Sequence, residues 1–191
     1  GKVSVEHLRV NADGRFFLFL HTYLVHEYLA APGHEARFAG SDASTLARGD
    51  LKFIRDRKIN EFFPGDLSEI GIICQGGLYN TVIRALAHYG LADNDGNARI
   101  PIYCLNVTYP LVDEEVVRFC LGKQNVLIVE EGHPDYIEQA IHTALRRADV
   151  QTKLHGKGPL PMGGQYNADV VQTGIAKWLE LAKPAGVDVR R

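Results

Sequence analysis

Residues 70–77 read Ile-Gly-Ile-Ile-Cys-Gln-Gly-Gly, and this stretch is the most informative indication of the fold. Its first five residues form a short apolar run that indicates a buried β-strand, and the glycine pair opens a segment with helical spacing from Leu78 to Leu91. A strand that passes through a glycine turn into a helix is the repeating unit of an open α/β sheet. The turn is then expected at the carboxyl edge of the sheet, where ligands and partner domains dock.

The rest of the chain repeats this arrangement. The apolar runs after the first are nearly continuous, as in parallel strands covered on both faces. We therefore predict an α/β fold with a doubly wound, mostly parallel, Rossmann-like sheet and helices on both faces. The expected strands cover residues 70–74, 102–107, 126–130 and 152–155, and the expected helices cover 78–91, 113–122, 134–147 and 168–183.

The chain divides into four segments on composition. We predict an irregular N-terminal extension or linker with an apolar aromatic segment over 1–49, a lead-in helix over 50–67, the α/β domain over 68–183 and a tail over 184–191. In the lead-in helix, Asp50 would be the N-cap, and Leu51, Ile54 and Phe62 would share an apolar face. The chain starts with Gly1 and its one methionine is Met162, so we expect a piece excised or processed from a longer protein.

Composition excludes several classes of function. The 21 basic and 23 acidic residues give a net charge of −2 without a basic block, which argues against nucleic-acid binding. The longest apolar stretch is too short and too polar to span a membrane, and no signal peptide is visible, so a cytoplasmic protein is expected. Three cysteines, Cys74, Cys104 and Cys120, are too few and too widely spaced for a zinc or iron–sulfur site, and are expected to be buried reduced thiols.

The turn Gln75-Gly76-Gly77 is the first candidate site. Free backbone N–H groups at the start of a helix can hold a phosphate or carboxylate. The segment is not a dinucleotide-binding G-x-G-x-x-G, because Asn80 stands at the third glycine position, and it lacks the Lys-Ser/Thr of a P-loop. An anion site, an interface and simple tight packing all stay open for this turn.

The second candidate is the run Glu130-Glu131-Gly132-His133-Pro134 at the end of the third expected strand. Two carboxylates and an imidazole could bind a metal or move protons. Successive side chains of a strand point to opposite sides, however, so Glu130 and Glu131 need not converge, and a helix cap or an interdomain contact is the preferred interpretation. The run 155–159, His-Gly-Lys-Gly-Pro, is expected to be a solvated turn.

Four motifs in order carry a family resemblance: I-G-I-I-C-Q-G-G-L-Y-N from residue 70, C-L-N-V-T-Y-P-L from 104, V-L-I-V-E-E-G-H-P from 126 and H-G-K-G-P-L-P from 155. Together they resemble the transketolase C-terminal-like domain of indolepyruvate:ferredoxin oxidoreductase, a thiamine diphosphate-dependent 2-oxoacid oxidoreductase. The similarity runs from about Ser68 to Leu181.

The resemblance implies a parent enzyme that oxidatively decarboxylates arylpyruvates to acyl-CoA with thiamine diphosphate, Mg²⁺, iron–sulfur clusters and coenzyme A, and that passes electrons to ferredoxin. The Gly-Asp-Gly motif of its thiamine site and a cysteine cluster are absent from this chain, so no cofactor is expected in this fragment. The expected partners are other domains or subunits of the parent, with a homo-oligomer also open, and neither nucleic acid nor membrane.

We therefore expect a non-catalytic structural or interface domain, inactive alone. Its alternative is a stand-alone anion- or nucleotide-binding module that uses the Gly76-Gly77 turn, and a third option is a small enzyme with Glu131 and His133 as acid and base. No catalytic, cofactor-binding or metal residue is assigned. The predicted interface or anion-site residues are Gln75, Gly76, Gly77, Tyr109, Pro110, Glu130, Glu131 and His133.

Overall fold

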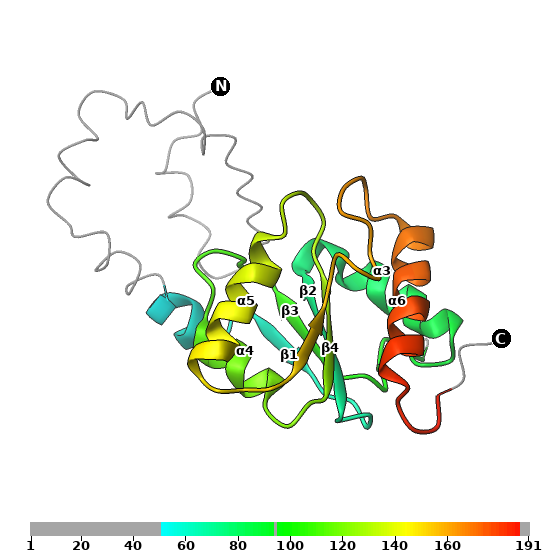
Figure 1. The fold of residues 1–191 in the computed structure, drawn as a ribbon, viewed down its shortest axis with the longest axis horizontal. Coiled ribbons are helices and arrows are strands. Elements are labelled where there is room, and N and C mark those ends of the chain that lie inside the picture. Colours follow the sequence, from blue (N-terminus) through cyan, green and yellow to red (C-terminus); the bar gives the residue numbers. More distant parts are fainter. Residues whose placement is uncertain (1–50, 94, 188–191) are drawn as a thin grey trace, which may run out of the picture. The chain divides into compact units, whose positions relative to one another are not determined.

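A five-stranded sheet forms the centre of the computed structural model, which describes residues 51–93 and 95–187 (Figure 1). The sequence expectations for residues 1–49 and for the end of the tail lie outside the described residues. The strands lie in the order β1-β3-β2-β4-β5, and all neighbours pair in parallel except β1 with β3. Their bounds are β1 Glu61–Phe63, β2 Ile70–Gln75, β3 Ile102–Leu105, β4 Asn125–Val129 and β5 Lys153–His155.

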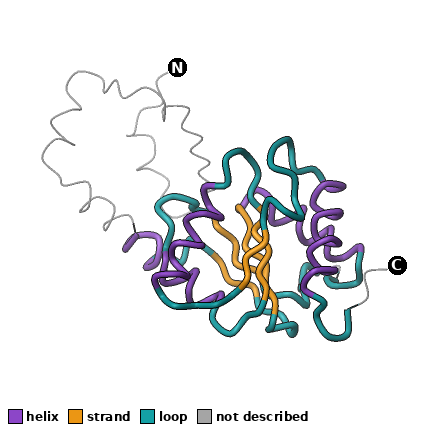
Figure 2. The backbone as a smooth tube through the Cα atoms, viewed as in Figure 1, coloured by secondary structure: helices purple, strands orange, loops and turns teal. Residues whose placement is uncertain are grey.

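Helices cover both faces of this sheet (Figure 2). The 3₁₀ turn η3 leads into α3, which packs against α6 on one face, while α4 packs against α5 on the other. The predicted doubly wound α/β fold is thus confirmed. The helical bounds are η3 Gly76–Leu78, α3 Tyr79–His88, α4 Asp113–Cys120, α5 Tyr136–Arg147 and α6 Ala168–Ala182.

Alternating strand residues divide the core into two clusters. Ile72 and Leu127 belong to the cluster under α3 and α6, whereas Ile73 and Ile128 belong to the cluster under α4 and α5. This alternation is the two-residue period of a strand, and both faces are apolar because both carry helices. The apolar runs seen in the sequence are therefore strands buried on both sides.

The strand order creates a topological switch point between β2 and β4 at the carboxyl edge of the sheet. From β2 the chain leads outward to β3, and from the neighbouring strand β4 it leads outward to β5 in the opposite direction. In open α/β sheets, ligands bind in the crevice at such a switch point. Gln75 ends β2 and Glu130 follows β4, so the first two candidate sites of the sequence flank the same crevice.

The predicted lead-in helix over 50–67 is wrong in its second half. Residues 51–56 are helical, Lys58 takes a left-handed conformation with φ of 49°, and Glu61–Phe63 form β1. Phe62 therefore does not share a helix face with Leu51; its ring stacks on Tyr103 of β3 with centroids 4.4 Å apart. Antiparallel pairing with β3 determines this segment, and three residues are too few to show a strand period in the sequence.

All three cysteines are free and buried, as expected. Cys74 and Cys104 lie in the cluster under α3 and α6, and Cys120 lies in the opposite cluster. In the described part of the chain, no helix is long and apolar enough to cross a membrane.

Gly65 lies in the connection between β1 and β2, and it packs closely against residues 99–101, just before β3. A Cβ atom there would lie 2.4 Å from the carbonyl oxygen of Arg99 and 2.6 Å from the backbone of Pro101, neither of which can rotate away. We expect Gly65→Ala to lower the free energy of unfolding by about 1–3 kcal/mol. The measurement is urea unfolding followed by circular dichroism.

Gly77→Ala is the matched control, because no atom lies within 4 Å of a Cβ built at that position. It should change stability by less than about 0.5 kcal/mol. Equal stability of both variants would mean that the 64–67 segment does not pack on residues 99–101 as described.

Candidate functional site

A hydrogen bond within the chain joins the two strand ends at the switch point. The side-chain oxygen of Gln75, at the end of β2, accepts a hydrogen bond of 2.7 Å from the backbone N–H of Glu131, which follows β4. A side chain that would otherwise be available to a ligand thus connects the two strand ends. The structure therefore brings Gln75 and Glu131 together, as expected from their positions at the same edge of the sheet.

Glu130 is 5% exposed and holds the start of α5. Its two carboxylate oxygens accept from the backbone N–H groups of Ile137 at 2.9 Å and Glu138 at 3.1 Å. The first N–H groups of a helix lack partners within the helix, and a carboxylate there also interacts favourably with the helix dipole. Of the roles left open for Glu130, the helix cap is the one observed.

Lys157 corrects the expectation that residues 155–159 are a solvated turn. Its ammonium donates to the carbonyl oxygens of Glu130 at 2.5 Å and Gly132 at 2.7 Å, and to the Tyr166 hydroxyl at 3.1 Å. Burial lowers the pKa of Lys157, while nearby carboxylates, Glu130 first, act in the opposite direction. The lysine ties the loop after β5 to the end of β4, and nothing in its local sequence indicated those distant acceptors.

Tyr166 closes the same loop from its far end. The residue is 3% exposed, its backbone N–H donates to the Glu131 carboxylate at 2.5 Å, and its hydroxyl donates to the carbonyl of Pro161 at 2.5 Å. Burial, followed by the charge of Glu130, raises the pKa of Tyr166 to about 12. Glu131 is therefore engaged with a backbone N–H.

Glu131 and His133 are not brought together as an acid–base pair. No hydrogen bond or ion pair links them in the described ranges, and His133 is exposed. Over residues 51–93 and 95–187, no three His, Cys, Asp or Glu side chains are placed to hold a metal ion. The donor groups of this edge are used within the fold.

A second hydrogen-bonded cluster lies at the end of β3. The Asn106 amide donates to the carbonyl of Ile59 at 2.8 Å and to the Glu61 carboxylate at 2.9 Å, and so fixes the strand end against β1. Its oxygen faces the glycine turn, where a Cβ atom on Gly76 would lie 2.4 Å from it. Gly76 is thus required by close packing on Asn106, whereas Gly77 is exposed with open space around it.

Tyr103, in the middle of β3, extends this cluster into the core. Its hydroxyl donates to the Glu115 carboxylate at 2.8 Å and accepts from the Asn60 amide at 3.2 Å. Burial and the hydrogen bond to Glu115 raise the pKa of Tyr103. The Asn60 oxygen accepts from the N–H of Val107 at 2.9 Å. The sequence did not indicate this network because its hydrogen-bonded partners are up to 47 residues apart.

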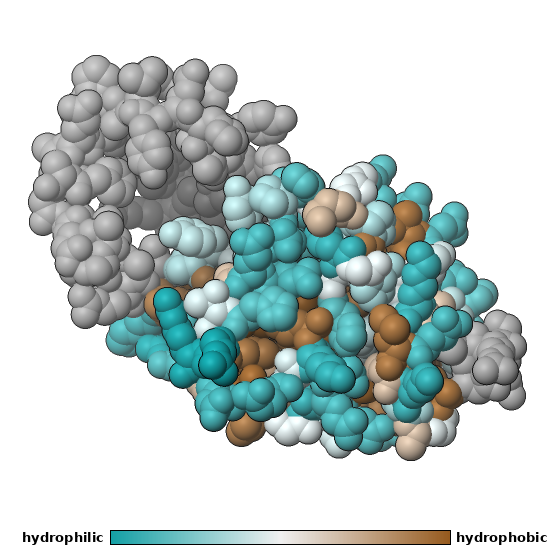
Figure 3. All heavy atoms as spheres, viewed as in Figure 1, coloured by the Kyte–Doolittle hydropathy of each residue, from teal (hydrophilic) through white to brown (hydrophobic). Residues whose placement is uncertain are grey.

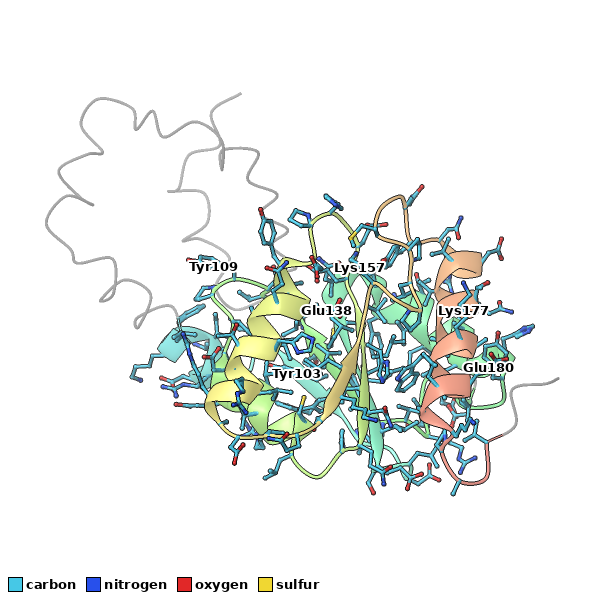
Figure 4. All side chains as sticks on the ribbon, in the orientation of Figure 1. Tyr103, Tyr109, Glu138, Lys157, Lys177 and Glu180 are labelled. Carbon is cyan, nitrogen blue, oxygen red and sulfur yellow. The ribbon has the colours of Figure 1, made fainter. Side chains whose placement is uncertain are left out.

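Large side chains remain exposed along the carboxyl edge. Tyr109, in the loop after β3, is 89% exposed and projects from the molecule in Figure 4. Tyr136, at the start of α5, is 71% exposed, and Met162, in the loop after β5, is 47% exposed. Pro110 is half-buried beside Tyr109. Two loops and the start of α5 therefore each carry an exposed aromatic or sulfur-containing side chain at one edge of the sheet.

A groove of about 450 Å³ lies elsewhere, beside β5. Apolar surface is visible between α5 and α6 in Figure 3, and Figure 4 places Glu138, Lys177 and Glu180 around this region. Leu154 and Leu181 supply apolar side chains to the groove. None of the predicted interface or anion-site residues lines this groove, so the groove and the predicted site are separate features.

A family model described as the indolepyruvate ferredoxin oxidoreductase middle domain matches residues 60–170. Indolepyruvate oxidoreductase subunit IorA of Methanothermobacter thermautotrophicus is 32% identical over 124 residues, which cover 63% of this chain and 19% of that protein. The IorA subunit of Archaeoglobus fulgidus is 30% identical over 134 residues, covering 70% of this chain and 19% of that protein. The chain thus spans about a fifth of the length of these curated relatives.

A solved structure described as "Split gene transketolase, inactive beta4 tetramer" is also similar, with 16% identity and a TM-score of 0.47. The similarity covers 64% of this chain and 42% of that one.

Lys157 provides a test of how the edge is closed. We expect Lys157→Met to lower the free energy of unfolding by about 2 kcal/mol, because hydrogen bonds from a charged donor are lost and two carbonyl groups near the loop lose their partner. For a chain of this length that corresponds to a fall of about 4–8 °C in the thermal midpoint, measured by calorimetry.

Lys177→Met is the control, since Lys177 is exposed on α6 and the substitution removes the same charge. Its thermal midpoint should stay within about 2 °C of the wild type. If both substitutions had the same small effect, Lys157 would not be holding the loop.

Proposed function

This chain belongs to the indolepyruvate ferredoxin oxidoreductase middle-domain family, and we propose that it is a non-catalytic interface domain of a larger oxidoreductase. The observation that carries the proposal is the state of the carboxyl edge. Gln75, Glu130 and Glu131 could each present a polar group to a ligand at the switch point, and each is hydrogen-bonded within the chain. In open α/β sheets ligands bind at this switch point, and in this chain the polar groups there are used in internal hydrogen bonds, which supports an interface role over a ligand site.

The exposed part of the same edge supports docking to another protein surface. Tyr109, Tyr136 and Met162 are exposed there, and tyrosine and methionine are enriched in protein–protein interfaces. Tyrosine contributes a large contact area and loses little side-chain entropy because it has few rotatable bonds. We infer that other domains or subunits of the oxidoreductase contact the loops after β3, β4 and β5.

The proposed parent activity is oxidative decarboxylation of indolepyruvate or related arylpyruvates to acyl-CoA, with electrons passed to ferredoxin. The thiamine diphosphate, Mg²⁺, iron–sulfur clusters and coenzyme A of such an enzyme do not fit the donor groups described for this chain. Both Glu130 oxygens are occupied by α5, and the three cysteines lie on two different faces of the sheet. We therefore assign these groups to other parts of the parent.

An anion- or nucleotide-binding role of the glycine turn is the second candidate. The observation in its favour is that Gly77 is exposed and has open space around it. Against it, η3 is a single 3₁₀ turn, and Gly76 already packs on the Asn106 side chain.

Calorimetric titration of the purified chain separates these two functions. We expect no binding of thiamine diphosphate with Mg²⁺, and no stabilisation by nucleotides, coenzyme A or phosphate in a thermal-shift assay, because the ammonium of Lys157 at this edge already donates to two backbone carbonyls. Stabilisation that Gly77→Val abolishes would favour the second candidate, and tight Mg²⁺-dependent thiamine diphosphate binding would overturn the first.

Hydrogen exchange in the assembled oxidoreductase tests docking itself. Amides of residues 107–112 and 131–136 should be protected in the assembly more strongly than in the chain alone. The double variant Tyr109→Ser/Tyr136→Ser should lose that extra protection and weaken turnover of the assembly, while its own thermal midpoint stays unchanged because both side chains are exposed.

Leu121→Ser is the control, because Leu121 is 68% exposed and follows α4 at the opposite, amino edge of the sheet. It should keep both protection and turnover. Equal protection of the loops in the free chain and in the assembly would contradict docking at the carboxyl edge.

A further inference from the structure

Two of the three cysteines lie side by side on neighbouring strands, on the same face of the sheet. Cys74 of β2 and Cys104 of β3 are register partners in parallel strands, and both side chains belong to the core cluster under α3 and α6. Adjacent strands lie about 4.8 Å apart, so paired residues fall within the range of roughly 4.4–6.8 Å between Cα atoms that disulfides span. The sulfur atoms thus point to the same side from neighbouring strands.

The surroundings of the pair differentiate its two thiols. The Cys104 thiol lies 3.6 Å from the side-chain oxygen of Asn106, and a hydrogen bond between the two cysteine side chains lowers the pKa of Cys104 and raises that of Cys74. A thiolate is the nucleophilic form of cysteine, so either sulfur becomes the attacking atom once it has lost its proton.

Access to the pair is through the carboxyl edge. Cys74 is 1% and Cys104 3% exposed, but each lies within two residues of the edge, next to half-buried Gly76 and exposed Asn106. Oxidation of the pair requires a local opening at this edge that admits a reagent as small as hydrogen peroxide. Local openings of this kind cost less free energy than global unfolding.

We propose that Cys74 and Cys104 form an oxidative modification site, a dithiol that hydrogen peroxide converts into a disulfide joining β2 to β3. The thiolate of one cysteine attacks one peroxide oxygen, the O–O bond breaks, and this cysteine becomes a sulfenic acid while the released hydroxide takes up the thiol proton as the first water. The sulfur of the other cysteine then attacks the sulfenic sulfur, and a second water carries away the hydroxyl group with the second thiol proton. Two thiols lose two electrons in total, and one peroxide is reduced to two waters.

Cys120 is an internal reference for this chemistry. It lies in the cluster under α4 and α5, on the other face of the sheet, and burial raises its pKa to about 12. Neither of the other two cysteines shares that cluster. Oxidation directed by the folded structure therefore leaves Cys120 as a thiol.

Peptide mapping after peroxide treatment of the native 191-residue chain tests the proposal. After acid quenching, free thiols are alkylated in denaturant and the digest is analysed by mass spectrometry. We expect a linked pair of peptides containing Cys74 and Cys104, two hydrogens lighter than the sum of the reduced peptides, with Cys120 alkylated. Dithiothreitol before alkylation should restore three alkylated cysteines, and treatment in guanidinium chloride should remove the preference for this pair.

Two variants complete the test. Cys104→Ala should abolish the linked product, and Cys120→Ala should leave its yield unchanged, with the folding of both verified by circular dichroism. The wild-type map decides the matter even if Cys104→Ala fails to fold. The proposal is overturned if native Cys74 and Cys104 are alkylated as fully as Cys120 after peroxide, if Cys120 enters the linked product, or if Cys104 is oxidised to sulfinic acid without any linked product.

Discussion

The ammonium of Lys157 is the contact on which the form of the carboxyl edge depends. It reaches two backbone carbonyls beyond the end of β4 and one tyrosine hydroxyl, and thereby holds the loop between β5 and α6 against the end of β4. Removing a charge from water is costly unless hydrogen bonds replace hydration. Here the carbonyl oxygens of Glu130 and Gly132 and the Tyr166 hydroxyl accept the hydrogen bonds of the Lys157 ammonium.

Glu130 plays the complementary role beneath that loop. The Glu130 carboxylate accepts hydrogen bonds from two N–H groups in the first turn of α5, and the Glu130 backbone carbonyl accepts one from Lys157. One residue therefore connects the strand end, the following helix and the loop after β5. The charges of Glu130 and Lys157 therefore stabilise the arrangement of the chain at this edge.

The sequence predicted the parts of this fold that depend on local patterns. Continuous apolar runs located β2, β3 and β4 to within two residues at each end, and the spacing of Val171, Ile175 and Trp178 located α6. It missed β1, whose three residues pair with β3 across about forty positions of chain. It also missed Lys157, because a lysine between two glycines looks like a solvated turn when its acceptors are 25 and 27 residues away.

The glycine pair after β2 shows how a ligand-site motif can serve packing instead. In a dinucleotide fold, such glycines allow the backbone to approach a pyrophosphate. At Gly76 the close approach is to the amide oxygen of Asn106, which in turn is fixed by Ile59 and Glu61. Gly76 thus allows the ends of β2 and β3 to approach each other closely next to β1. Gln75 makes the corresponding connection between β2 and β4, so side chains of the chain itself link the end of the central strand to both neighbouring strands.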